Sequence, residues 1–175
     1  PGTSGGHTET ACCWNGASTT NRQYRSLTQP FTTQFMNFLG RNIPRDDIHP
    51  GTELPEANLS ELSLEGVDLS GANLAGVSFH HTDLSNADLS GATLTDAKLA
   101  DATLHNVDLS EADLLGATLE TADLTGAQLD NACLMGADLT DATLNDATGN
   151  GATLTDAKVT RVTAQDASLR GADLH

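Results

Sequence analysis

A five-residue repeat governs most of this chain. From residue 57 to residue 174 one pattern recurs every five residues, with an apolar side chain in every unit but one and Ala usually two positions before it. We count 24 units in one register, and Leu occupies the repeated position, here called position i, in twenty of them. A period of five fits neither the 3.6-residue period of a helix nor the alternation of a long strand. The chain is therefore predicted to fold from short repeated units.

Each unit has the pattern of a very short strand followed by a turn. Positions i−2 and i are apolar with a polar residue between them, and the turn that follows is rich in Gly, Asp and Asn. One unit cannot bury its own Leu, so the units must wind into coils and stack. Small Ala beside large Leu can fill a narrow interior with little empty space.

The recurring Ala-Asp/Asn-Leu sequence, as in residues 57–59 and 137–139, resembles the pentapeptide-repeat family, whose pattern is A-(D/N)-L-x-x. The resemblance implies an all-β solenoid, a right-handed four-sided β-helix with four units in each coil and positions i and i−2 inside. Twenty-four units would make about six coils, a rod about 29 Å long at the usual spacing of strands. Residues twenty apart should then stack. The expected core includes Leu59, Leu69, Phe79, Leu89, Leu109, Leu129 and Leu139.

The columns of Leu are weakest near the C-terminus. Gly149 stands where a Leu is expected, which predicts either a tolerated local defect or a functional dent. Val159, Val162 and Ala164 follow it at inward positions, so we expect the last coil and a half to be the least stable part of the rod.

The residues before the repeat divide into two segments. Residues 1–29 are predicted to be flexible, because residues 1–20 are rich in Gly, Ser and Thr. Residues 30–53 are predicted to form a short capping helix and a linker, followed by the β-helix over 54–175. The helix is expected over 30–39, between Pro30 and Gly40, and would cover the open end of the first coil. Its apolar stripe is Phe31, Phe35, Phe38 and Leu39.

The outward positions are strongly acidic. The net charge is −16, and residues 1–53 hold four acids and four bases, so the repeat carries all of it. Stacking should align Asp68, Asp88 and Asp108 on one face, with Asp130 on the next coil, while Lys158 and Arg161 weaken the negative field near the C-terminus. These acids either form an interaction surface or keep a repetitive protein soluble. The candidate surface is Asp68, Asp88, Asp108, Asp130, Asp83 and Asp123.

These features favour a non-enzymatic protein. Nucleic-acid binding through phosphates needs an excess of Lys and Arg, and this chain is strongly acidic instead. A transmembrane helix needs a long apolar run, which the chain lacks. No nucleophile elbow, phosphate loop or zinc-protease motif is present. We expect a protein-interaction or structural scaffold with an unidentified protein partner. The family resemblance implies an alternative, a DNA mimic that binds a type II topoisomerase such as gyrase and protects against quinolones.

No cofactor or metal is expected. His80 and His81 are adjacent, but His105 should lie on another face, so three ligands should not converge. Cys12 and Cys13 cannot both pair with Cys133, but the sequence allows a disulfide between one of them and Cys133. The alternative is that all three thiols are reduced, and on that basis we expect the protein in the cytoplasm. The repeat is still in register at the last residue, which leaves a homodimer through the open C-terminal coil as one alternative.

Overall fold

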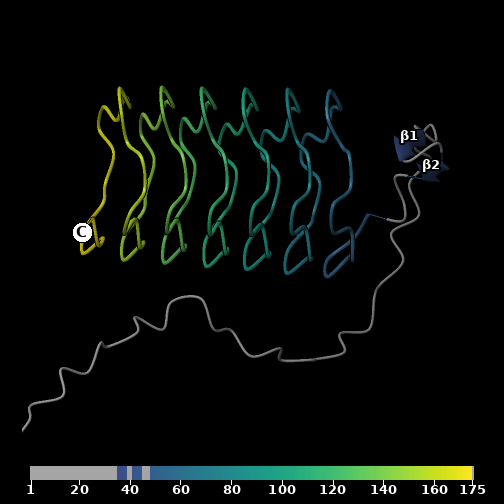
Figure 1. The fold of residues 1–175 in the computed structure, drawn as a ribbon, viewed down its shortest axis with the longest axis horizontal. Coiled ribbons are helices and arrows are strands. Elements are labelled where there is room, and N and C mark those ends of the chain that lie inside the picture. The colour runs from purple at the N-terminus through teal and green to yellow at the C-terminus, as the bar shows by residue number, and fades with distance from the viewer. Residues whose placement is uncertain (1–34, 39–40, 45–47, 175) are drawn as a thin grey trace, which may run out of the picture.

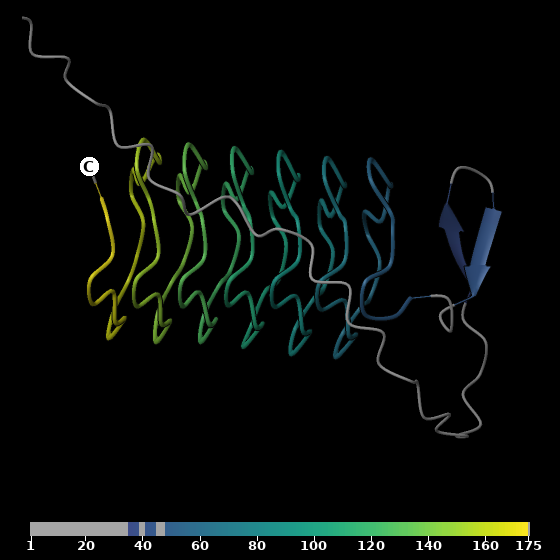
Figure 2. The same cartoon turned by 90° about the horizontal axis from the view of Figure 1, so that it is seen from below.

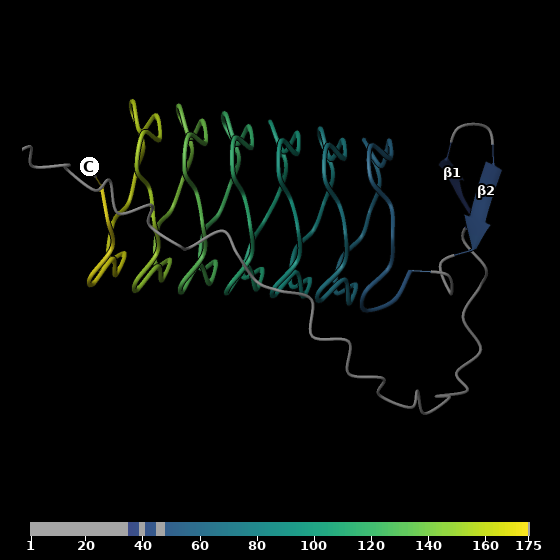
Figure 3. The ribbon, with the colours of Figure 1, turned by 60° about the horizontal axis from the view of Figure 1, so that its bottom comes forward.

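The computed structural model describes residues 35–38, 41–44 and 48–174, which form a two-stranded hairpin and a stack of coils (Figure 1). The hairpin consists of β1 (Phe35–Phe38) and β2 (Arg41–Pro44). The coils follow one another along the stack in the order of the sequence, and views from two further directions show the same regular spacing (Figure 2, Figure 3). The repeated segment is therefore a β-solenoid. Among the described residues, no helix has the length and apolar character that crossing a membrane requires.

The predicted helix is wrong over residues 35–38. These residues form β1, which pairs antiparallel with β2 so that Phe35 lies opposite Pro44. Two Phe residues three apart suit a helical stripe, but aromatic residues also favour strands, and so short a run cannot separate the two periods. The two runs are separated by only two residues, Leu39 and Gly40, a spacing that a hairpin allows, although this dipeptide is not among those typical of two-residue turns.

The other parts of the N-terminal prediction lie outside the described residues. Residues 1–29, Phe31 and Leu39 are among them. That the segment before the repeat covers the first coil stays a prediction.

Adjacent coils are joined by regular parallel pairing. Single-residue bridges connect residues that are twenty apart, from Glu53 with Asn73 to Thr153 with Asp173. The backbone N–H of Leu69, for example, donates to the carbonyl of Asp88 at 2.8 Å. Each coil therefore contains four five-residue units, which gives the solenoid four sides.

The four corners of each coil are turns with a left-handed residue. The carbonyl of Leu69 accepts a hydrogen bond from the N–H of Ala72 at 3.0 Å, and Gly71 between them has φ 63°. A positive φ at the third residue is typical of a type II turn. Every fifth residue from Gly51 to Gly171 has a φ between 52° and 73°. This requirement explains why Gly, Asn and Asp dominate this position, because they tolerate the left-handed region best.

The interior is a continuous apolar core of Leu and Ala. Thr82, a polar residue at an i−2 position, is also buried, and its hydroxyl donates to the carbonyl of Leu59 at 2.8 Å. This bond removes the cost of an unsatisfied buried hydroxyl. Each of the predicted core residues is at most 2% exposed: Leu59, Leu69, Phe79, Leu89, Leu109, Leu129 and Leu139.

The space beside Gly149 is filled by a neighbouring side chain. A Cβ added at Gly149 would lie 2.8 Å from Cδ2 of Leu169, which stands one coil later in the same column. Gly149 does not share the positive φ of the turn glycines. Packing, rather than a backbone conformation that only Gly tolerates, therefore decides which residue this position accepts.

The last described coil is less buried than the coils before it. Val159 and Leu174 are 52% and 61% exposed, whereas Leu139 and Leu154, one coil earlier in the same columns, are buried. That the last coil and a half is the least stable part of the solenoid stays a prediction. Pairing of a second copy with this end stays a prediction.

Candidate functional site

Three aspartates stack on one face of the solenoid. Backbone bridges join Asp68 to Asp88 and Asp88 to Asp108, and the next bridge leads to the neutral Gln128. Adjacent strands lie about 4.8 Å apart, so the three carboxylates form a short, closely spaced line of negative charge. We call Asp68, Asp88 and Asp108 the acidic column. Asp68 is exposed and the other two are half-buried.

The aspartates at position i−1 also stabilise the turn that follows them. The Oδ1 atom of Asp88 accepts hydrogen bonds from the backbone N–H of Ser90 at 2.9 Å and from its hydroxyl at 2.6 Å. This local turn, in which an Asp side chain binds the backbone two residues later, fixes the carboxylate against its own strand. Both bonds recur at four further pairs: Asp68 with Ser70, Asp83 with Ser85, Asp123 with Thr125, and Asp138 with Thr140.

Loss of this turn should lower stability even though the side chain lies at the surface. We expect Asp88→Ala to reduce the free energy of unfolding by about 1 kcal/mol, because the bonds to Ser90 are lost. Asp88→Asn keeps an oxygen acceptor at the same place and should cost less. Urea unfolding of both variants measures the difference. Equal stability of the two variants would show that these bonds contribute nothing.

The other predicted acids do not extend the acidic column. Asp130 lies one position after a repeated Leu, and its Oδ1 accepts hydrogen bonds from the backbone N–H of Asn150 at 2.6 Å and from its side-chain amide at 2.9 Å. Asp83 and Asp123 stand on the neighbouring face, where Thr103 separates them in the ladder. The six predicted residues therefore do not form one surface. Three lie in the acidic column, two lie on the neighbouring face, and the carboxylate of Asp130 is bound by the amide groups of Asn150.

His105 lies with the two aspartates of that neighbouring face. Its Nε2 is 2.8 Å from Oδ2 of Asp123. Burial raises the pKa of Asp123, but hydrogen bonds from Thr125 and His105 outweigh it, and the net pKa is lowered. The pKa of Asp83 is lowered chiefly by the hydroxyl and backbone N–H of Ser85, with a smaller contribution from His105. Both carboxylates are thus held in the charged form.

Two ion pairs reduce the negative charge near the C-terminus, as stacking predicted. Lys158 Nζ lies 2.8 Å from Oδ2 of Asp138, and Arg161 pairs with Asp141. The bond from Lys158, with that from Thr140, lowers the pKa of Asp138 to about 2. Exposed pairs of this kind add little stability. Each pair offsets the charge of one carboxylate on this part of the solenoid.

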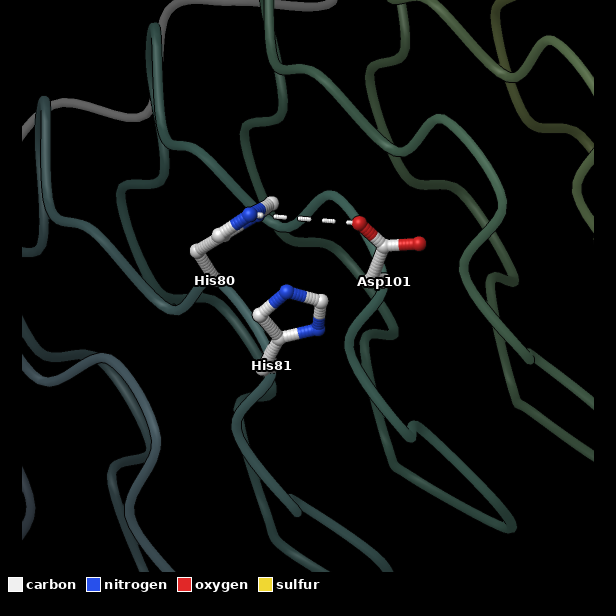
Figure 4. A group of neighbouring side chains, drawn as sticks. All are labelled: His80, His81 and Asp101. Atoms are coloured by element: carbon white, nitrogen blue, oxygen red, sulfur yellow. Dashed lines mark ion pairs between the residues drawn. The ribbon is translucent and has the colours of Figure 1, made fainter.

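Three potential metal ligands do come together, contrary to the sequence prediction. Ligand atoms of His80, His81 and Asp101 all lie within 4.8 Å of one another (Figure 4). The third ligand is not His105 but the residue directly above His81 in the stack. Asp101 stands twenty residues after His81, which is the coil repeat.

The sequence model described as pentapeptide repeats matches eight copies in this chain. The matches cover residues 52–91, 72–110, 87–126, 102–141 and 137–175, well over half of the chain. The chain belongs to the pentapeptide-repeat family. The matched repeats correspond to the five-residue units that form the four-unit coils described above.

Several solved structures of pentapeptide-repeat proteins are similar to this chain. Rfr23 from the cyanobacterium Cyanothece 51142 is 28% identical, over 68% of this chain and 88% of its own, with a TM-score of 0.49. HetL from Nostoc sp. strain PCC 7120, a protein involved in heterocyst differentiation regulation, is 24% identical over 71% and 86%, with a TM-score of 0.46. Trypsin-treated QnrB1, a plasmid-mediated fluoroquinolone resistance protein, is 20% identical over 69% and 83%, with a TM-score of 0.19. The comparison with curated proteins found no match.

Proposed function

We propose that this pentapeptide-repeat protein is a non-enzymatic interaction scaffold whose acidic column binds a basic surface of a partner protein. The observation that carries the proposal is the stack of Asp68, Asp88 and Asp108 on successive coils, joined by the bridging ladder. Backbone N–H groups of the residues two positions later hold each carboxylate through Oδ1. Carboxylates fixed in this way need little ordering when a partner binds, which favours recognition of Lys or Arg side chains.

A second candidate function, mimicry of DNA toward a type II topoisomerase such as gyrase, is favoured by the linear charge density. Residues 54–175 contain 20 acidic and four basic side chains. The net charge of −16 along a rod of about 29 Å is one charge per about 1.8 Å. Duplex DNA carries one charge per about 1.7 Å of its axis. The length, however, is less than one turn of DNA, about 34–36 Å.

The two functions make different demands on the acidic column. The triple variant Asp68→Asn, Asp88→Asn and Asp108→Asn removes three charges but keeps an oxygen acceptor in each turn. In affinity capture from the source cells, the scaffold proposal expects a partner that binds the wild-type chain at least about tenfold more tightly than this variant, with an affinity that falls as salt rises. Equal capture by both chains would reject the acidic column as the binding surface.

A matched control removes the same charge elsewhere. Asp96, Asp146 and Asp156 are exposed corner residues with φ of 57–60°, a conformation that Asn also tolerates. Their triple Asn variant should bind the partner as the wild type does. If DNA mimicry is correct, wild-type chain should inhibit supercoiling by purified gyrase, and both triple variants should lose inhibition alike, because overall charge density decides it. Absence of inhibition by the wild type would reject mimicry.

A further inference from the structure

One corner of the solenoid carries an unusual group of side chains. The rings of His80 and His81 lie 4.1 Å apart between centroids, tilted by 47°, and Nε2 of His80 is 3.9 Å from Oδ2 of Asp101 (Figure 4). All three residues are exposed. Two imidazoles and a carboxylate directed to one place make a donor set that binds divalent transition metals.

The backbone fixes the relative positions of the three residues. The N–H of His81 donates to the carbonyl of Ala100, the residue before Asp101, so the two coils are joined at this corner. His81 and Asp101 share the left-handed turn conformation, with φ of 55° and 57°. The ligands therefore project from two adjacent, hydrogen-bonded turns of a rigid stack, which reduces the ordering needed to bind an ion.

A residue on the following coil supports the carboxylate. The hydroxyl of Thr121 lies 2.5 Å from Oδ1 of Asp101 and 2.5 Å from the carbonyl oxygen of Glu120, so the two acceptors share its single proton. Oδ2 of Asp101 is the oxygen on the side of His80. Hydrogen bonds of this kind orient metal ligands and tune affinity in known sites. Three successive coils thus contribute to one small cluster.

We propose that His80, His81 and Asp101 form a binding site for a divalent transition metal of the zinc type, with water completing the coordination. In a tetrahedral zinc site, ligand atoms 2.0–2.2 Å from the metal lie about 3.3 Å from one another. The three ligand atoms lie within 4.8 Å of one another. Side-chain rotations that bring these atoms closer together by about 1.5 Å would give the distances of a zinc site. The negative rod also raises the local concentration of cations.

The donor set selects among cations. Mg²⁺ and Ca²⁺ prefer sites made only of oxygen ligands, whereas imidazole suits zinc, copper and nickel. The inference is independent of the proposed scaffold function, because the acidic column lies on a different side of the coil. It concerns binding and assigns no reaction to the ion.

The experiment is a titration of the full chain with Zn²⁺, followed by NMR of histidine-labelled protein and by calorimetry. We expect the imidazole signals of His80 and His81 to shift together and to saturate at one ion per chain. Asp101→Asn keeps the turn, because Asn tolerates the left-handed region, and should weaken binding at this site at least about tenfold. His81→Asn should do the same for the same reason.

His105→Gln is the matched control, since it removes a histidine that also contacts an aspartate, Asp123, on another face. This variant should keep the zinc affinity of the His80 and His81 signals. Signals that do not move in excess Zn²⁺ would overturn the proposal. An unchanged affinity in Asp101→Asn would also overturn it, because the carboxylate would then take no part.

Discussion

Replacing Leu109 with Lys should unfold or shorten the solenoid. Leu109 is fully buried in the middle of the stack, in the same column as Leu89 and Leu129. The substitution removes about 2 kcal/mol of apolar burial and places an ammonium group where no acceptor is available, at a cost of several kcal/mol more. Because each coil contacts only its neighbours, the damage should spread from this coil in both directions. Circular dichroism melting and hydrogen exchange measure it.

The control for this variant is Gln128→Lys. Gln128 is exposed, pairs with Asp108 in the ladder, and its carbonyl accepts the N–H of Leu109. This variant therefore adds the same charge beside Leu109 in the ladder, but on the exposed surface of the solenoid. We expect its melting to remain close to that of the wild type. A melting curve of Leu109→Lys that matches this control would mean that position i does not point inward.

The solenoid itself was predictable because one pattern is repeated along most of the chain. All units share one register, so a shift of that register by one residue would move Leu from the inside to the outside in every unit. The burial of Leu and Ala therefore follows from the repeat. The corner positions were less obvious. Gly71, Asn86 and Asp96 look only polar or small in sequence, but each has a positive φ. Their common property is tolerance of that conformation rather than polarity.

The roles of the aspartates were harder to predict, because the same residue type both carries surface charge and stabilises turns. Asp88 contributes to a charged column and also holds the N–H and hydroxyl of Ser90. The spacing of Asp to Ser two residues later was visible in the sequence and could have indicated the turn. The cluster of His81 with Asp101 was predictable from the twenty-residue coil, provided that corners were stacked as well as faces.

The hairpin is the described element that the sequence pattern did not predict. Residues 35–44 lie outside the repeat, so no second copy of the pattern tests an assignment made from a few residues. Phe35 and Phe38 satisfy a helical spacing, and the pairing of β1 with β2 overrides it. Tertiary or cross-strand contacts commonly decide short aromatic segments in this way.

Truncation of Phe79 should give the second large loss of stability. Phe79 is fully buried and is the largest side chain of the described core. It stands in a column with Leu59 and Leu99, whose side chains are also buried. Phe79→Ala leaves a cavity between them, and we expect the free energy of unfolding to fall by about 3–5 kcal/mol. Urea unfolding, with the slope compared to that of the wild type, measures the change.

Phe79→Leu provides the matched control, because it installs the residue that the repeat uses at most other inward positions. The coils on either side already accommodate Leu in this column, so the side chain should repack at a cost below about 1.5 kcal/mol. The difference between the two variants isolates the cavity from the loss of the ring. If Phe79→Ala were no less stable than Phe79→Leu, the column would not be closely packed around this position. A difference of several kcal/mol would instead show that the narrow interior cannot collapse, because the backbone ladders on all four sides hold the coils at a fixed spacing.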